Sequence, residues 1–213
     1  MVLYHGSLMV VEHPEYGLGR VNNDYGQGFY CTEDIELAKE WASRDINGGF
    51  VNKYEFDDSG LRVLDISDLG LLAWITILIR NRSIRYASPI EKRSAEFLLS
   101  RYLPVYEEYD VIRGYRADDS YFSYTRAFLS NTITLEQLEM AVRLGNLGMQ
   151  ICLKSPESFG RIRFTDAETV DGYHYYPMRM KRDRKARNDH MRLLEEDAVD
   201  GTYIRDIIRE GGA

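Results

Sequence analysis

The stretch GQGFYCTEDIELAKEWA at residues 26–42 predicts a short strand followed directly by a helix. Residues 28–31 are apolar or aromatic after a glycine-rich loop, which is typical of a strand. Thr32 is the expected N-cap, because acidic residues come directly after it and apolar residues then recur at helical spacing. Tyr30 on the strand and Trp41 on the helix can face one slot and hold a flat heterocycle between them. The alternative is that both rings belong to the core.

The rest of the chain predicts an α+β protein with one main domain. Further apolar segments with the strand pattern lie at residues 2–4, 109–114, 148–154 and 159–164. Two more strands are expected to pair as a hairpin across the DDSG turn, at residues 52–56 and 61–65. Helical periodicity covers residues 69–80 and 90–102, and a capping box at Thr134 and Gln137 begins another helix that ends before Gly145.

Composition and charge exclude several classes of protein. The chain has 213 residues, of which 44% are hydrophobic and 29% are charged, so it can bury a core and is neither disordered nor a disulfide-dependent mini-protein. The net charge of −7 provides no global positive field for nucleic acid or an anionic membrane. The longest apolar run, at residues 69–79, is too short to span a bilayer. Two cysteines and no signal-peptide pattern at the start indicate a cytoplasmic protein.

The last part of the chain is charge-segregated. Residues 178–192 carry seven Lys or Arg against two Asp, and residues 193–213 carry six acids against two Arg. We therefore divide the chain into a main domain at residues 1–177 and a charged helical segment at residues 178–213, packed on the domain or appended to it. The basic stretch could bind an acidic partner or a nucleic-acid backbone, although a solvated helix face is the usual outcome.

Two further segments carry polar side chains suited to binding. Residues 3–7, LYHGS, predict a strand ending in His5, whose imidazole can hydrogen-bond a sugar hydroxyl beside a glycine that a ligand can approach. A structural histidine is the alternative. In residues 148–154, alternation places Gln150 and Cys152 on one face and the apolar residues on the other. Lys154 shares the face of Gln150 but can simply point to solvent.

Taken together, these fragments resemble the ADP-ribosyltransferase superfamily, in the branch of diphtheria toxin and the poly-ADP-ribose polymerases. Residues 3–7 are similar to its first motif, a strand ending in His-Gly-Ser. Residues 26–30 are similar to its Gly-x-Gly-aliphatic-Tyr strand, which a second aromatic follows. The resemblance implies a split antiparallel β-sandwich with flanking helices, which binds NAD as a consumed co-substrate. No metal is expected, because the histidines and cysteines lack the spacing typical of a metal site.

The same resemblance assigns roles to individual residues. It implies that His5 holds the adenosine ribose, that the Gly6 backbone clamps the nicotinamide amide, and that Tyr30 and Trp41 sandwich the nicotinamide ring. The triad of this branch ends in glutamate, and Gln150 stands at that position. Arg20 and Arg116 are expected to bind the pyrophosphate, because guanidinium groups match phosphate oxygens. The two motifs add Ser7, Gly28 and Phe29 as further NAD contacts.

The chain is still more similar to a bacterial group within that superfamily, the DUF3990 proteins, over nearly its whole length. The matching text includes DYGQGFY at residues 24–30, ADD at 117–119, Gln150 and GTYIRDI at 201–207. Members are commonly encoded beside a small partner, which implies a bacterial toxin with an antitoxin. The implied activity is transfer of one ADP-ribose from NAD to an unidentified macromolecule, protein or nucleic acid, with release of nicotinamide.

Departures from the family pattern leave alternatives open. Gln150 can hydrogen-bond a ribose but lacks the charge that stabilises a cationic transition state, and it cannot act as a general base. Ala38 replaces a serine of the family. Chain elongation is therefore not expected, and a catalytically silent module that binds NAD or ADP-ribose, or a partner-binding protein, is the alternative. Asp118 and Asp119 are the candidate base, because repulsion favours a proton on one of them, unless they form an ordinary solvated turn.

Overall fold

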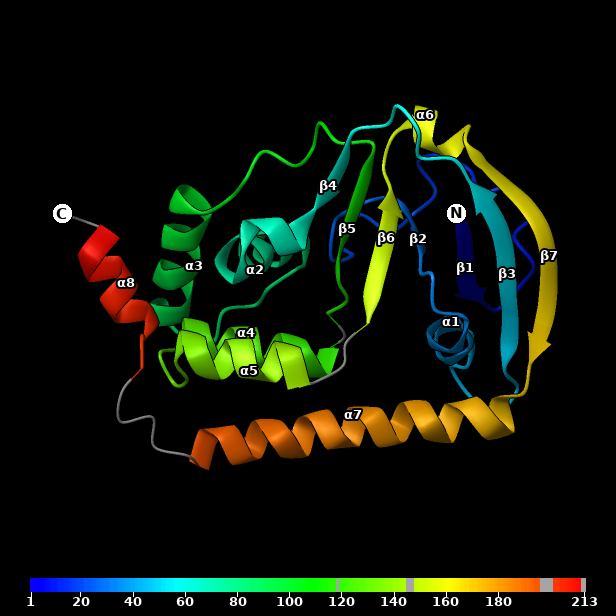
Figure 1. Cartoon of the computed structure of the whole chain (residues 1–213). Helices are drawn as coiled ribbons and strands as arrows, with labels where there is room; N and C mark the ends of the chain where they lie inside the picture. Colours follow the sequence, from blue (N-terminus) through cyan, green and yellow to red (C-terminus); the bar gives the residue numbers. More distant parts are fainter. Residues whose placement is uncertain (118, 145–147, 196–200, 212–213) are drawn as a thin grey trace.

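The chain forms two β-sheets: the four-stranded sheet lies in the middle of the molecule and the three-stranded sheet lies at one side (Figure 1). The computed structural model describes residues 1–117, 119–144, 148–195 and 201–211. The three-stranded sheet has the order β1-β3-β7, with these strands at Val2–Ser7, Gly49–Phe56 and Ile162–Val170. The four-stranded sheet has the order β2-β6-β5-β4, with these strands at Phe29–Cys31, Met149–Leu153, Val111–Tyr115 and Val63–Asp65.

The predicted hairpin between residues 52–56 and 61–65 is wrong, because both edges of β3 are already occupied. β1 pairs with one edge of β3 and β7 pairs with the other, both antiparallel. The chain therefore leaves the three-stranded sheet after β3, and β4 pairs parallel to β5 in the other sheet. A parallel pair needs a long crossover, which residues 66–110 supply. The four-stranded sheet is thus mixed, where a purely antiparallel sandwich was expected.

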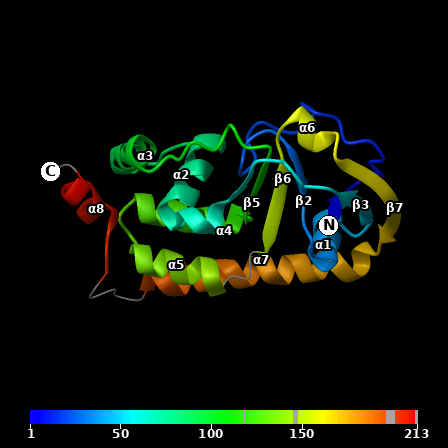
Figure 2. The same ribbon diagram turned by 45° about the horizontal axis from the view of Figure 1, so that its top comes forward.

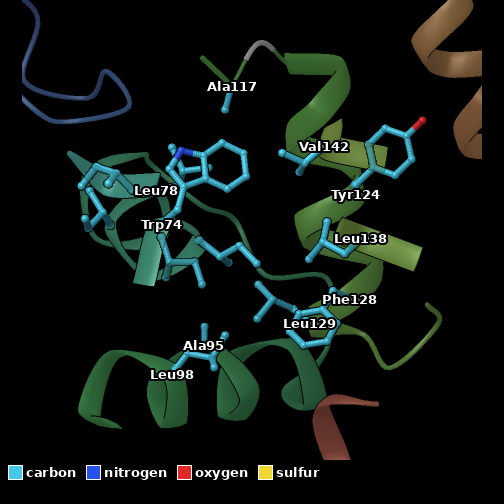
Figure 3. Close-up of a cluster of buried hydrophobic side chains, with 14 of the residues drawn as sticks. Trp74, Leu78, Ala95, Leu98, Ala117, Tyr124, Phe128, Leu129, Leu138 and Val142 are labelled. Atoms are coloured by element: carbon cyan, nitrogen blue, oxygen red, sulfur yellow. The ribbon is translucent and has the colours of Figure 1, made fainter. Parts of the chain in front are cut away.

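Helices cover the four-stranded sheet and bury the main core (Figure 3). The crossover contains the 3-10 helix η1 (Ile66–Leu69) and two helices at the predicted places, α2 (Leu71–Asn81) and α3 (Pro89–Arg101). The predicted capping box is confirmed at the start of α5 (Leu135–Leu144), where Thr134 and Gln137 exchange hydrogen bonds of 2.9 and 3.2 Å.

Helix α4 (Asp119–Leu129) is not predicted by the sequence pattern. Its residues DSYFSYTRAFL are mostly aromatic or hydroxyl-bearing and have modest helix propensity. Burial of Tyr124, Phe128 and Leu129 in the main core stabilises it instead.

Helix α1 (Ile35–Ala42) follows β2 directly, as residues 26–42 predict. Its N-cap is Asp34, whose carboxylate accepts hydrogen bonds from the backbone N–H groups of Glu36 and Leu37. Thr32, the expected cap, is still in extended backbone and exchanges two backbone hydrogen bonds with Tyr4 of β1. This bridge joins the two sheets beside α1.

Strand β6 is the second strand of its sheet, hydrogen-bonded to β2 on one side and β5 on the other. The predicted alternation is confirmed. Cys152 packs into the main core under the helices, whereas Ile151 and Leu153 pack into a second core together with Leu3 and Phe56 of the other sheet. Gln150 is therefore a buried polar residue on an interior strand and not an edge residue.

Helix α7 (Gly172–Glu195) spans the molecule at the ends of the strands (Figures 1 and 2). It contacts α1 near its own start and α4 and α5 farther along. The helix runs without a break across the expected division at residues 177 and 178. The shorter helices are α6 (Pro156–Phe159) and α8 (Ile204–Gly211). Within the described residues, no helix has the length and apolar character that crossing a membrane requires.

Candidate functional site

A cavity of about 710 Å³ lies where β1, β2, α1 and β6 meet. Most of the residues expected to bind a ligand line this cavity: His5, Gly6, Arg20, Gly28, Phe29, Tyr30, Trp41, Arg116 and Gln150. They come from segments that are far apart in the sequence. The fold therefore brings the three motifs of the sequence to one place.

The remaining expected site residues lie elsewhere or are not described. Ser7 does not line the cavity: its hydroxyl donates to the Met9 carbonyl at 2.7 Å and accepts from Asn52 Nδ2 at 2.9 Å. Asp118 lies outside the described residues, and Asp119 begins α4 with a side chain that is not described. For Lys154 the sequence left open a position in solvent; its ammonium group instead donates to the Tyr25 carbonyl and lies 5.7 Å from the centroid of the Tyr106 ring.

His5 is held as a neutral ring with a defined tautomer. Its Nδ1 lies 2.7 Å from the Tyr30 carbonyl oxygen, and because a carbonyl can only accept, Nδ1 carries the proton. Burial lowers the pKa of His5; the hydrogen bond to Tyr30 opposes this, and the charge of Arg44 adds to it. A neutral ring protonated at Nδ1 leaves Nε2 with a lone pair, so His5 is set to accept a hydrogen bond at Nε2.

Gly6 is required for packing as well as for access. A Cβ atom at this position would overlap the Ala38 carbonyl oxygen and would crowd the backbone of Ala42 and the side chain of Trp41. The backbone of β1 therefore lies directly against α1. This contact fixes Trp41 on α1 relative to His5 on β1.

Tyr30 lines the cavity, and its hydroxyl is used by hydrogen bonds within the fold. The hydroxyl donates to the Gly26 carbonyl at 2.7 Å and accepts from the Tyr25 backbone N–H at 2.9 Å. Burial raises the pKa of Tyr30 far above its ordinary value, so the phenol is neutral. The ring also lies parallel to that of Tyr25, with centroids 6.5 Å apart.

Trp41 carries an unsatisfied donor. Its indole Nε1 is buried and has no hydrogen-bond partner among the described residues. The guanidinium of Arg116 lies over its ring, 5.6 Å from the centroid. A buried donor without a partner is costly, so Trp41 Nε1 is an unsatisfied group in a residue that lines the cavity.

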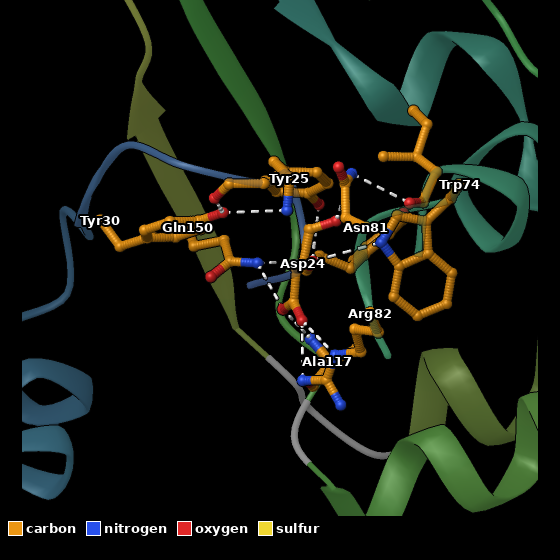
Figure 4. A network of polar contacts seen from close by, with 11 residues as sticks. Asp24, Tyr25, Tyr30, Trp74, Asn81, Arg82, Ala117 and Gln150 are labelled. Atoms are coloured by element: carbon orange, nitrogen blue, oxygen red, sulfur yellow. Dashed lines mark hydrogen bonds and ion pairs between the residues drawn. The ribbon is translucent and has the colours of Figure 1, made fainter. Parts of the chain in front are cut away.

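Gln150 belongs to a buried polar network that the sequence does not predict (Figure 4). Its side-chain Nε2 donates to Asp24 Oδ2 at 2.8 Å and to the Tyr115 carbonyl at 3.2 Å. Asp24 is 5% exposed; its Oδ1 pairs with Arg82 Nε at 2.8 Å, and its Oδ2 also accepts from the Ala117 backbone N–H at 2.8 Å. Asp24 opens the DYGQGFY segment, but its partners are distant in sequence, so only the fold identifies them.

Arginines give the cavity wall an excess of positive charge. Those that line it are Arg20, Arg44, Arg82, Arg116 and Arg179, against the acids Glu15 and Asp24 in the described part of the chain. Arg82 is neutralised by Asp24. The arrangement suits an anionic ligand such as a phosphate ester.

Arg44 and Arg179 are cavity residues that sequence reasoning missed. Arg179 comes from α7, where Nη1 donates to the Ser43 carbonyl at the end of α1 at 3.2 Å. Nearby, Glu40 forms an ion pair with Arg182 of α7. Burial raises the pKa of Glu40, while Arg182, Arg116 and Arg179 oppose the shift. The basic tail was the available signal, but its helical pattern does not show which arginine reaches the cavity.

A comparison with known protein families matches residues 1–164 to the family described as "Protein of unknown function (DUF3990)". The chain belongs to the DUF3990 family. The DUF3990 match contains β1, β2, α1 and β6, and hence every residue of the cavity wall named above except Arg179. Neither a curated protein nor a solved structure matches the chain.

Proposed function

We propose that the protein is an NAD-dependent mono-ADP-ribosyltransferase with an ADP-ribosyltransferase-like split sandwich. One observation carries the proposal: most of the residues that the sequence resemblance assigns to NAD, from β1, β2, α1 and β6, line one cavity. Its volume of about 710 Å³ lies within the range typical of small-molecule sites. The parallel pairing of β4 departs from a purely antiparallel sandwich, but β4 is the edge strand farthest from β2.

The described side chains fit the groups of NAD. Neutral His5 presents Nε2 to a ribose hydroxyl, and the faces of Tyr30 and Trp41 suit the nicotinamide ring. Arg20 and Arg116, which line the cavity, are suited to the pyrophosphate. The cavity therefore offers a partner to the sugar, the base and the charge of the dinucleotide.

The proposed reaction replaces one bond at the ribose carbon C1″. The bond from C1″ to the nicotinamide nitrogen breaks, and its electron pair leaves with nicotinamide. A nucleophilic atom of the acceptor forms the new bond to C1″ and loses its proton. Tyr30 and Trp41 hold the leaving ring, and Gln150 accepts a hydrogen bond from the ribose. Asp118 or Asp119 remains our proposed base for the acceptor proton.

Two measurements test the proposal, with bacterial lysate as the source of acceptors. The first is the release of nicotinamide, and the second is the transfer of label from NAD labelled in its adenosine half. We expect Gln150→Ala and Tyr30→Ala each to lower the rate by about 100-fold or more, because both act where the transition state forms. Gln137→Ala is the matched control, since this amide caps α5 outside the cavity. Near-wild-type rates in both cavity variants, at matched stability, would refute the assignment.

A catalytically silent module that binds NAD or ADP-ribose is the second candidate. Two observations favour it: Gln150 carries no charge, and Asp24, the carboxylate beside it, is already paired with Arg82. This candidate expects NAD to raise Tm while no nicotinamide is released. Turnover that depends on Gln150 would exclude it.

We further propose that the protein acts as a bacterial toxin paired with a small antitoxin, as the family resemblance implies. The acceptor is a protein or a nucleic acid. Expression of the wild-type chain in bacteria should arrest growth, whereas Tyr30→Ala should not. Equal growth arrest by both chains would show that any toxicity does not come from this cavity.

A further inference from the structure

Gln150 has a fixed orientation in the cavity wall. Both hydrogens of its amide nitrogen are used, by Asp24 Oδ2 at 2.8 Å and by the Tyr115 carbonyl at 3.2 Å. Both partners are acceptors, so the amide nitrogen must face them and Oε1 must face away. Figure 4 shows this oxygen turned away from Asp24. Because Gln150 lines the cavity, Oε1 is the atom that it can present to a ligand.

Asp24 is itself held in place by an ion pair and a backbone hydrogen bond. Arg82 contacts Oδ1 through Nε at 2.8 Å and through Nη2 at 2.7 Å. The Ala117 backbone N–H donates to Oδ2 at 2.8 Å, beside the bond from Gln150. Asp24 and Gln150 are 5% and 4% exposed, so water does not compete for these bonds. The carboxylate therefore has no freedom to rotate away from Gln150.

We propose that Asp24 is the positioning residue for Gln150, and that the two act as one unit toward the ribose hydroxyl of the substrate. This inference rests on the proposed function. A carboxylate that accepts from an amide N–H increases the negative charge on the amide oxygen, which strengthens the bond that Oε1 accepts. Asp24 thus supplies part of the polarity that a glutamate at position 150 would bring.

The same contact explains why position 150 holds glutamine. A glutamate there would put a second carboxylate within hydrogen-bonding distance of Asp24, in a site where both are buried. Two such carboxylates repel, and one of them keeps its proton to a higher pH. Gln150 is the residue of the same shape that can donate to Asp24.

Three variants test the unit by steady-state nicotinamide release across a pH series: Asp24→Asn, Gln150→Glu and the double variant. Asp24→Asn should lower kcat about tenfold or more and change the KM for NAD less than about threefold, because the polarised Oε1 acts in the transition state. Gln150→Glu should show an added ionisation with a raised pKa, since two carboxylates share a proton. In the double variant, the amide of Asn at position 24 can donate to the carboxylate of Glu at position 150. The ionisation of that carboxylate should therefore move to lower pH than in Gln150→Glu, and kcat should exceed that of Asp24→Asn.

Asp110→Asn is the matched control. Asp110 is 7% exposed and accepts from the Arg62 backbone N–H at 2.8 Å, but it does not line the cavity. It should lose stability and keep kcat. An unchanged kcat in Asp24→Asn, or identical pH profiles for Gln150→Glu and the double variant, would overturn the inference.

Thermal unfolding separates this inference from the proposed function. A wild-type protein that releases no nicotinamide refutes the proposed function and the ligand role of the unit. The pairing is then tested by Tm alone: Gln150→Glu should lower Tm by about 5 °C or more, and adding Asp24→Asn should restore part of the loss. Equal Tm values for Gln150→Glu and the double variant would refute the pairing itself.

Discussion

Replacement of Tyr30 by phenylalanine separates the two roles that the structure gives this residue. The phenylalanine keeps the ring on the cavity wall and removes the hydroxyl, which donates to the Gly26 carbonyl at 2.7 Å and accepts from the Tyr25 N–H at 2.9 Å. Each hydrogen bond contributes about 0.5–1.5 kcal/mol, so Tyr30→Phe should lower the free energy of unfolding by about 1–3 kcal/mol. For a chain of this size the loss corresponds to a decrease in Tm of about 2–12 °C.

Turnover should respond differently from stability. If the ligand meets the face of the ring, folded Tyr30→Phe should keep kcat within about threefold of wild type, whereas Tyr30→Ala should lose about 100-fold or more. Urea denaturation and nicotinamide release measure the two effects. Tyr173→Phe, at an exposed position, is the control and should change neither. A Tyr30→Phe variant as stable as wild type would refute the hydrogen bonds, and one as inactive as Tyr30→Ala would refute the role of the ring face.

The remaining predictions concern charge and capping. Burial lowers the pKa of His5 below its ordinary 6.5, so near and below that pH the unfolded chain binds a proton that the folded chain does not. The stability of the fold should therefore decrease as the pH drops below 6.5. His5→Gln should flatten this pH dependence of Tm, and an unchanged slope would contradict the prediction. Arg179→Ala should weaken NAD binding about tenfold, as measured by calorimetry. Arg187→Ala, at an exposed position, is the control and should leave the affinity for NAD unchanged. Equal affinities for the two variants would exclude Arg179 from the site. Asp34→Ala should cost about 0.5–2 kcal/mol in urea denaturation, and no loss would mean that α1 is capped otherwise.

The secondary structure that local patterns encode was predictable. Period-two alternation correctly separated Cys152 from Ile151 and Leu153, and the Thr134 capping box marked the start of α5. Pairing between distant strands was not predictable in this way. The expected hairpin failed because both edges of β3 are occupied, one by β1 and the other by β7, which lies more than 100 residues farther along the chain. Helix α4 was missed because burial, and not propensity, stabilises it.

The candidate site likewise contains residues that local sequence patterns identify and residues that only the fold identifies. His5, Tyr30 and Trp41 could be named from the sequence because each lies in a short segment, residues 3–7 or 26–42, that the local pattern and the family resemblance single out. Asp24, Arg82 and Arg179 could not, because their roles depend on partners brought together by the fold. Asp24 lies 126 residues from Gln150, and Arg179 lies in a segment that was expected to be packed on the main domain or appended to it, with no contact specified. In the sequence these three residues look like any other charged residues, and only their positions in the cavity wall identify them as site residues.

The most direct test of the account is mass spectrometry of macromolecules from a labelling reaction. The wild-type protein is incubated with bacterial lysate and with NAD isotopically labelled in its adenosine half, and the masses of the recovered macromolecules are measured. The account predicts a labelled protein or nucleic acid that carries one ADP-ribose at each modified position, formed together with free nicotinamide and absent with Gln150→Ala. Label that stays in intact NAD, or that is recovered only as free ADP-ribose, would contradict transfer to a macromolecule by this cavity.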